Sequence, residues 1–384
     1  MLISGHSSYL IIFGVAFFLA LVLTPVSIVL AKKIGVVDIP DDGRRMHTRT
    51  IACLGGMAIC FASVITLAFY GYQYQNVPLI LAGGMVMFIL GVIDDKYQLP
   101  AYIKFIVQMA IAVFMYYMGL RISFIHNYFG GGILHLGEAG DFIITVLWIV
   151  GITNSINLID GLDGLAAGTV FINSLCMAYI IAGNGQMVGR MAASMGFVAI
   201  AGACLGFLPY NFSPAKTFMG DGGALFLGFM IACLSILGRL KESTVITMIV
   251  PIFVLALPLF DTLFAILRRT FKGGNIMAAD NRHLHHILMQ SGYGHKRAVI
   301  MLYGISGIMG VAAILLSKEL RMEALILFAV ACLYIYVFLT DPSHKETDEI
   351  VVDTEQDTQE VPSDINDELV DNFTEGDSEE FEER

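Results

Sequence analysis

The chain has 384 residues, is 57% hydrophobic and only 14% charged, and has a mean hydropathy of +0.74. This composition excludes a soluble enzyme, and several uncharged runs reach the ~20 residues that a helix needs to cross a bilayer. The formal net charge of −11 is unevenly placed, because residues 343–384 contain 17 acidic and two basic residues, whereas the rest contains 16 acidic and 20 basic ones.

Eleven transmembrane helices are predicted, with no soluble domain between them. They cover residues 9–31, 51–72, 77–94, 100–119, 141–159, 163–183, 187–208, 221–238, 245–267, 298–316 and 323–340. The predicted fold class is therefore an all-α polytopic membrane protein, with residues 1–342 as one transmembrane domain. Residues 343–384 are rich in charge and poor in aromatic residues, and are predicted to be a disordered acidic tail.

The basic residues of the predicted loops indicate the orientation, because lysine and arginine gather on the cytoplasmic side of membrane proteins. One side holds fourteen of them and the other side holds six. The fourteen are Lys32, Lys33, Arg44, Arg45, Arg49, Lys96, Lys104, Lys216, Arg268, Arg269, Lys272, Arg282, Lys296 and Arg297. The N-terminus is then outside, and an odd number of spans places the acidic tail in the cytoplasm.

The first cytoplasmic loop, residues 38–49, combines cations with a histidine at the membrane surface. Arg44, Arg45 and His47 are candidates for a phosphate-binding edge, because guanidinium groups offer paired donors that match phosphate oxygens. The alternative is that these residues only anchor the loop on the cytoplasmic side.

Asp94 and Asp95 are adjacent at the cytoplasmic end of the third predicted span. Carboxylates at a helix C-terminus oppose the helix dipole, and Lys96 alone compensates them poorly. A divalent cation or a proton-transfer role is the favoured explanation, and a capping turn is the alternative. Lys104, in the fourth span, is placed either to reach an anionic head group or to extend to the interface.

Residues 154–165 have the sequence NSINLIDGLDGL and lie between two long apolar runs. Asn157, Asp160 and Asp163 place amide and ionisable groups at the end of a membrane segment. Uncompensated charge is costly there, so a functional site is favoured. The glycine after each aspartate lets the backbone approach a ligand closely. A polar turn with capping aspartates is the alternative.

Asp221 opens the eighth predicted span after a glycine-rich turn, and Asn211 lies just after the end of the seventh. A helix N-terminus of this kind can hold phosphate with its backbone N–H groups, while the carboxylate can hold Mg²⁺. An ordinary N-cap aspartate is the alternative, although a cap does not require the three glycines around it.

The largest cytoplasmic loop, residues 268–297, contains Arg282, His283, His285 and His286. Three histidines in four residues suggest Zn²⁺, but no cysteine or further histidine stands at ligand spacing. Hydrogen-bond donors to a diphosphate fit the basic surroundings better. A solvated loop is the third interpretation.

Carboxylates for Mg²⁺, basic groups for phosphate oxygens and glycine-rich helix starts are the parts of a phosphoryl-transfer site. Mg²⁺ is preferred to zinc because the ligands are carboxylates, and Mn²⁺ could replace it. The position of these groups at the membrane surface implies one lipid substrate and one water-soluble nucleotide.

Five segments resemble the polyprenyl-phosphate N-acetylhexosamine-1-phosphate transferase family and span nearly the whole membrane body. They are IPDDGRRMH (39–47), GVIDDKYQLPAYIKFIVQ (91–108), NSINLIDGLDGLAAG (154–168), FLPYNFSPAKTFMGDGGALFLG (207–228), and DTLFAILRR with AADNRHLHH (261–286). The HLHH form resembles the branch that uses UDP-N-acetylglucosamine (UDP-GlcNAc), as in teichoic-acid linkage and O-antigen initiation. The peptidoglycan branch usually shows three consecutive histidines, and Leu284 interrupts that run here.

The resemblance implies a role for each residue at a matching position. Asp221 matches a Mg²⁺ ligand. Asp94 and Asp95 match a pair in which one carboxylate deprotonates the lipid phosphate and the other assists metal or carrier binding. The remaining matches are Asn157, Asp160, Asp163 and Asn211 as nucleotide-sugar contacts or their supports, and His283, His285 and His286 as diphosphate contacts.

Two positions depart from the family pattern. Ala52 and Cys53 stand where relatives often have a proline and a basic residue, which weakens a phosphate contact there. Ala224 follows Gly222 and Gly223 where many relatives have a serine, so no hydroxyl is available there as an extra metal ligand.

The resulting hypothesis is transfer of GlcNAc-1-phosphate from UDP-GlcNAc to undecaprenyl phosphate at the cytoplasmic face of a bacterial plasma membrane. The product would begin a cell-wall or surface polysaccharide such as teichoic acid. The expected partners are the two substrates and the bilayer, with a homodimer as an option and no nucleic acid. One alternative is the phospho-N-acetylmuramoyl-pentapeptide transferase reaction. From another class, a cation-coupled transporter would place its carboxylates near the bilayer midplane.

Overall fold

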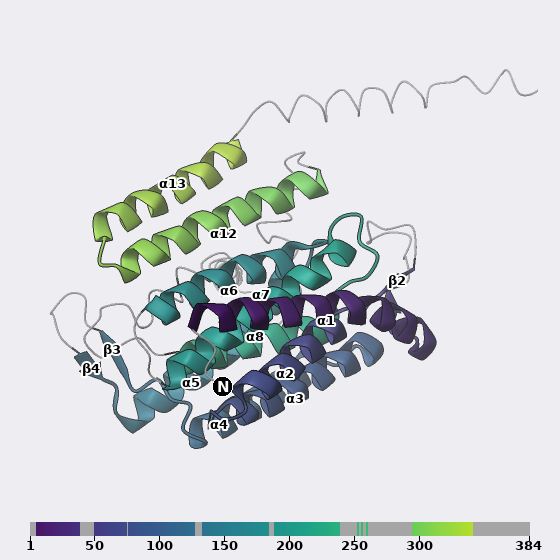
Figure 1. The fold of residues 1–384 in the computed structure, drawn as a ribbon, viewed down its shortest axis with the longest axis horizontal. Coiled ribbons are helices and arrows are strands. Elements are labelled where there is room, and N and C mark those ends of the chain that lie inside the picture. Colours follow the sequence, from purple (N-terminus) through teal and green to yellow (C-terminus); the bar gives the residue numbers. More distant parts are fainter. Residues whose placement is uncertain are drawn as a thin grey trace, which may run out of the picture. The chain divides into compact units, whose positions relative to one another are not determined.

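The computed structural model describes residues 5–38, 50–74, 76–126, 133–183, 188–238, 252, 255, 259 and 294–340. Long helices dominate these ranges and run along a common direction (Figure 1). They are α1 (Gly5–Ile34), α2 (Gly56–Gly71), α3 (Val77–Tyr97), α4 (Ala101–Tyr117), α5 (Gly137–Ile159), α6 (Leu165–Gly183), α7 (Val188–Asn211), α8 (Gly220–Leu237), α12 (His295–Ser317) and α13 (Arg321–Thr340).

Each predicted span within the described ranges coincides with one of these helices. The ninth span, residues 245–267, and the acidic tail, residues 343–384, lie wholly or almost wholly outside the described residues. Within the described ranges, seven helices are long and apolar enough to cross a membrane, namely α1, α3, α5, α6, α7, α8 and α12, while α2 and α4 are apolar but shorter. The chain is therefore a mostly helical, multi-pass membrane protein, and the total of eleven spans and their orientation stay predictions.

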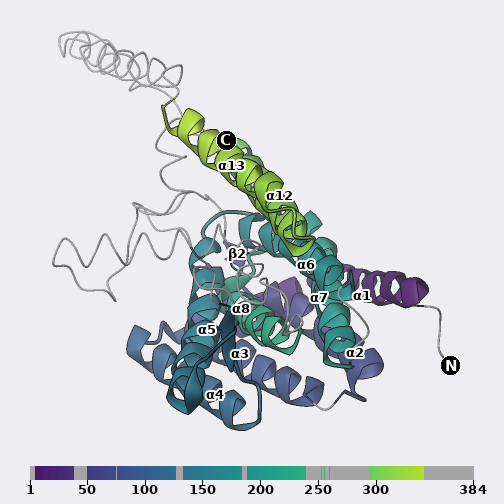
Figure 2. The same ribbon diagram turned by 90° about the vertical axis from the view of Figure 1, so that its left-hand side faces the viewer.

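Helix α8 lies at the centre of the bundle, with α2, α3, α5 and α7 packed around it (Figure 2). Its residues from Gly222 to Ile236 are all buried. Glycines bring the neighbouring backbones close to its first turn. A Cβ atom on Gly56 of α2 would lie 2.3 Å from the Cα of Gly223, and one on Gly91 of α3 would lie 2.4 Å from the Asp221 backbone. Only glycine permits such contacts, so the end of α3 lies directly beside the start of α8.

Two short antiparallel sheets depart from the all-helical prediction. Strand β1 (Val37–Asp38) pairs with β2 (Ile51–Ala52), and β3 (Phe124–His126) pairs with β4 (Ile133–His135). Strands of two or three residues are too short to carry an alternating hydrophobic pattern, so hydrophobic periodicity does not predict them.

Strand β2 also fixes the segment that leads into α8. The carbonyl oxygen of Ala52 accepts hydrogen bonds from the Thr217 hydroxyl and from the Phe218 N–H, each at 2.8 Å. The start of α2 and the start of α8 are therefore joined through main-chain contacts, and α8 begins at a defined place.

Candidate active site

The predicted acidic residues occupy neighbouring helix ends. Asp94 and Asp95 lie in the last turn of α3, Asp160 directly follows α5, and Asp221 is the second residue of α8. Because α8 packs against both α3 and α5, these ends meet at one end of the bundle. The glycine contacts of α8 with α2 and α3 are what allow the carboxylates to approach one another.

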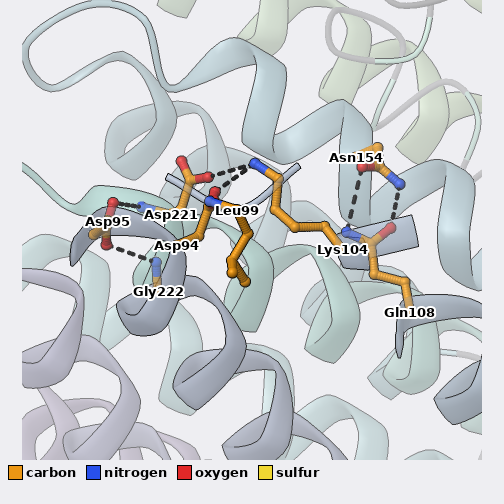
Figure 3. A network of polar contacts seen from close by, with 8 residues as sticks. All are labelled: Asp94, Asp95, Leu99, Lys104, Gln108, Asn154, Asp221 and Gly222. Carbon is orange, nitrogen blue, oxygen red and sulfur yellow. Dashed lines mark hydrogen bonds and ion pairs between the residues drawn. The ribbon is translucent and has the colours of Figure 1, made fainter. Parts of the chain in front are cut away.

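Lys104 of α4 joins Asp94 to Asp221 (Figure 3). Its Nζ donates to Asp94 Oδ2, and it donates to Asp221 Oδ2 at 3.1 Å. The other oxygen of Asp94 accepts the N–H of Leu99 at 2.7 Å. Asp94 is 7% exposed, Lys104 23% and Asp221 32%. The carboxylate that opposes the α3 dipole is thus compensated by an ammonium group from the next helix, and the cluster opens to solvent at Asp221.

Asp95 has a different role from its neighbour. Its Oδ1 accepts the N–H of Asp221 at 2.9 Å and its Oδ2 accepts the N–H of Gly222 at 3.2 Å. These are two of the first N–H groups of α8, so Asp95 caps that helix from outside it, where a negative charge also complements the helix dipole. The prediction that the α8 start holds phosphate with free N–H groups therefore fails for these two groups, because Asp95 already occupies them.

Asp221 itself is not the N-cap of α8. The N-cap position belongs to Met219, which makes no capping hydrogen bond with its side chain. Asp221 lies inside the first turn, and its carboxylate points to Lys104 rather than to the N–H groups of its own helix. The alternative interpretation of Asp221 as an ordinary capping residue is thus removed.

Replacing Asp95 with alanine is expected to destabilise the protein by about 1–2 kcal/mol, the usual cost of losing a helix cap. The measurement is the melting curve of the purified protein in detergent without substrates. Glu323→Ala is the matched control, because Glu323 is an exposed carboxylate in the first turn of α13. A wild-type melting curve for Asp95→Ala, together with a lost response to Mg²⁺, would instead make Asp95 a metal ligand.

The described residues fit a magnesium site built by two carboxylates. Among them, no three His, Cys, Asp or Glu side chains gather in a metal-holding arrangement. Proteins that bind Mg²⁺ beside a phosphate usually supply only one or two carboxylates, and phosphate oxygens and water complete the octahedron. Asp94 and Asp221 meet this requirement because both already converge on one cation, the Lys104 ammonium. Asp95 fits less well, since both of its oxygens accept backbone N–H groups.

A pair of amides fixes the helix that carries Lys104. The Nδ2 of Asn154 in α5 donates to the Oε1 of Gln108 at 2.6 Å, and Gln108 Nε2 donates back to Asn154 Oδ1 at 3.4 Å. Gln108 is 1% exposed and is the only buried residue in the first two turns of α4. The pair therefore holds the start of α4 against α5, one turn beyond Lys104 (Figure 3).

Asn157 and Asp160 follow Asn154 along the last turn of α5 and directly after it. The side-chain oxygen of Asn157 is buried and makes no hydrogen bond with any described residue. Removal from water raises the pKa of the Asp160 carboxyl to about 8, and the negative charge of Asp221 adds to the shift. Asp160 is thus within electrostatic reach of the cluster.

Asp163 and Asn211 join the loop after α5 to the segment before α8. Asp163 Oδ2 accepts the N–H of Ala215 at 3.0 Å. Asn211, the last residue of α7 and 2% exposed, accepts the N–H of Gly164 at 3.1 Å and donates to the Thr217 carbonyl at 3.0 Å. Asn211 therefore has a linking role within the protein, and a nucleotide contact by it stays a prediction.

Seven predicted site residues lie outside the described part of the chain, and their roles stay predictions. They are Arg44, Arg45 and His47 of the first loop, and Arg282, His283, His285 and His286 of the largest loop. Conversely, the sequence interpretation missed His295 and Tyr303 of α12, which contact the loop after α5. The only signal for them in the sequence is that His295 and Tyr303 are polar residues about two turns apart on a mainly apolar helix.

Comparisons with known proteins agree with the motifs. Residues 77–239 match the model of glycosyl transferase family 4. A Bacillus subtilis (strain 168) protein named "Probable undecaprenyl-phosphate N-acetylglucosaminyl 1-phosphate transferase" is 41% identical over 307 residues, which are 80% of this chain and 84% of that protein.

More distant relatives carry similar names. "Decaprenyl-phosphate N-acetylglucosaminephosphotransferase" of Mycobacterium tuberculosis (strain ATCC 25618 / H37Rv) is 34% identical over 74% of this chain and 76% of its own length. "Undecaprenyl-phosphate alpha-N-acetylglucosaminyl 1-phosphate transferase" of Escherichia coli (strain K12) is 27% identical over 71% of this chain and 74% of its own. The chain therefore belongs to glycosyl transferase family 4, among the polyprenyl-phosphate N-acetylhexosamine-1-phosphate transferases.

Proposed function

We propose that the protein transfers GlcNAc-1-phosphate from UDP-GlcNAc to undecaprenyl phosphate, releasing UMP and forming undecaprenyl-diphospho-GlcNAc. The observation that carries the proposal is the cluster in which Lys104 joins Asp94 and Asp221 at meeting helix ends. A cation and two carboxylates at this place suit a substrate rich in phosphate charge. The names of the relatives, which describe the same transfer to polyprenyl phosphates, support it.

The reaction balances as a single phosphoryl transfer. An oxygen of the lipid phosphate forms a bond to the β-phosphorus of UDP-GlcNAc, and the bond from that phosphorus to the bridging oxygen breaks. The bridging oxygen leaves with UMP. Where the lipid phosphate still carries a proton, a carboxylate of the cluster accepts it. Positioning and charge stabilisation supply most of the catalysis in this class of reaction.

The residues of the cluster divide this work. The Lys104 ammonium stabilises negative charge that develops between the two phosphates. Asp95 keeps the start of α8, and therefore Asp221, in place. Asp221 and Asp94 would hold Mg²⁺, with Mn²⁺ as a substitute. When bound, the ion would neutralise the diphosphate and stabilise the departing UMP.

Membrane position distinguishes the proposal from cation-coupled transport. Transporters place their ion-binding carboxylates near the bilayer midplane, often on broken helices. Here Asp94, Asp160 and Asp221 stand at the ends of α3, α5 and α8, where a lipid head group and a soluble nucleotide can meet. We assign this end to the cytoplasmic face of a bacterial plasma membrane, where the reaction would begin a polymer such as teichoic acid.

The test is UMP release by purified protein in detergent, with UDP-GlcNAc, undecaprenyl phosphate and Mg²⁺ each omitted in turn. We expect release only when all three are present. Release with UDP-N-acetylmuramoyl-pentapeptide but not with UDP-GlcNAc would move the protein to the peptidoglycan branch. If protein with a cooperative melting curve releases no UMP with any nucleotide-sugar, the proposal is rejected.

A further inference from the structure

The loop between α5 and α6, residues 160–164, begins at the end of α5, and α5 packs against α8, the helix that carries Asp221. Its first residue, Asp160, responds to the charges of Asp221 and Asp95 across the site. Its second residue, Gly161, is exposed, and its last, Gly164, is buried with a backbone φ of +81°. The carbonyl of Gly164 accepts the N–H of Gly168 in the first turn of α6 at 2.9 Å. The N–H groups of Asp163 and Gly164 precede that helix and need partners from outside it.

Side chains of α7 and α12 form hydrogen bonds with the main chain of Asp163 and Gly164. The N–H of Asp163 donates to His295 Nε2 at 2.9 Å. The N–H of Gly164 donates to Asn211 at 3.1 Å, and the carbonyl of Gly164 accepts the hydroxyl of Tyr303 at 2.5 Å. Three of the four main-chain groups of Asp163 and Gly164 therefore form hydrogen bonds with side chains of α7 or α12.

The position of Tyr303 is itself determined by packing. A Cβ atom on Gly168 of α6 would lie 2.1 Å from the hydroxyl and the adjacent ring carbon of Tyr303. The ring thus lies directly against the α6 backbone, and α12 packs along α6. His295 is the first residue of α12, so the two contacts bind the first turns of α12 to the loop at two points.

We propose that His295 and Tyr303 are positioning residues for the transferase reaction, which set the loop 160–164 for the nucleotide-sugar. The inference rests on the proposed function. Neither side chain contacts the cluster itself; both act through the backbone of Asp163 and Gly164. Gly161 of this loop is exposed, so the shape of the loop should govern the water-soluble substrate and leave the lipid substrate unaffected.

The variants are chosen to remove single hydrogen bonds. Tyr303→Phe keeps the ring that packs on Gly168 and removes only the hydroxyl. His295→Ala removes the acceptor of the Asp163 N–H, whereas His295→Gln offers a side-chain oxygen in its place. Tyr117→Phe is the control, because Tyr117 is 66% exposed on α4.

The expected result is a KM for UDP-GlcNAc raised about tenfold in Tyr303→Phe and His295→Ala, the size expected from the loss of one hydrogen bond that positions the loop. The KM for undecaprenyl phosphate and the kcat should stay near wild type. His295→Gln should recover most of the loss. A merely destabilised protein would show a lower kcat from fewer active molecules and an unchanged KM, which would overturn the positioning role.

Hydrogen–deuterium exchange of the peptide over residues 160–168 provides a second readout that needs no substrate. Faster exchange in Tyr303→Phe and His295→Ala, together with the KM change, supports the proposal. Faster exchange with an unchanged KM makes the contacts structural only and overturns it. If wild-type protein releases no UMP with any nucleotide-sugar, the proposed function fails and the positioning role fails with it.

Discussion

Asp221→Asn is expected to lower UMP release by about 100-fold or more, the range seen when one preorganised charge contact of a transition state is removed. The substitution removes the charge of Asp221 and keeps the neighbouring hydrogen bonds. The amide oxygen of asparagine can still accept from Lys104, which now lies 3.1 Å from Asp221 Oδ2. The α8 start keeps its cap because Asp95 binds backbone N–H groups, which the substitution leaves unchanged.

The measurement is the initial rate of UMP release with saturating substrates and Mg²⁺, alongside a melting curve. Glu138→Gln is the control, because Glu138 is an exposed carboxylate in the first turn of α5, at the far end from Asp160. Loss of activity with a wild-type melting curve supports the metal and charge role of Asp221. Full activity in Asp221→Asn would remove the metal assignment.

The helical bundle could be predicted from the sequence because each span depends on a local property. A run of apolar residues near the required length indicates a membrane helix whatever its neighbours are. The boundaries of the helices are predicted less well. The seventh span is predicted to end at residue 208, whereas α7 continues through Pro209 to Asn211. Packed membrane helices tolerate proline, since neighbouring groups satisfy the freed backbone.

The site could be predicted only as a set of separate candidates. Asp94 and Asp95 are adjacent and chemically identical, so the sequence offers no way to tell them apart. The structure does so through their partners. Asp95 binds the α8 backbone, more than 100 residues away, whereas Asp94 binds Lys104, which in turn contacts Asp221. Lys104 was interpreted as a residue that extends to the interface or a head group, because nothing local indicates that it joins two carboxylates.

The contacts of α12 were missed for the same reason. His295 and Tyr303 bind groups 132 and 139 residues earlier in the chain. No local pattern predicts such pairs, because their proximity depends on how α12 packs along α6. The small sheets are a second example, since pairing of two-residue strands depends on the turn between helices and not on a hydrophobic period.

The ammonium group of Lys104 and a bound metal ion would compete for the same two carboxylates. Its Nζ contacts both Asp94 and Asp221, the two carboxylates that fit a magnesium site. Buried carboxylates left without a cation are destabilising, so the ammonium stabilises the cluster until another cation arrives. A Mg²⁺ ion held by Asp94 and Asp221 would therefore compete with Lys104 for Asp221, and an ammonium group released in this way would be free to contact the diphosphate.

Lys104→Met should consequently weaken catalysis while strengthening metal binding. We expect turnover about 100-fold lower, because one cation is lost from the diphosphate, and a lower melting temperature without Mg²⁺. We also expect Mg²⁺ to raise the melting temperature more than in wild type, with an apparent Kd about tenfold lower, since no ammonium competes for Asp221. Melting curves over a series of MgCl₂ concentrations measure both effects.

Lys96→Met is the matched control, because Lys96 is an exposed lysine at the end of α3, beside the same aspartates in sequence. It should change neither turnover nor the response to Mg²⁺. A response to Mg²⁺ in Lys104→Met that is equal to or weaker than in wild type would contradict competition at this cluster, because removing the ammonium would then have freed no metal-binding carboxylate. If Lys104→Met shows lower turnover but no stronger response to Mg²⁺, Lys104 contacts the substrate and does not compete with the metal.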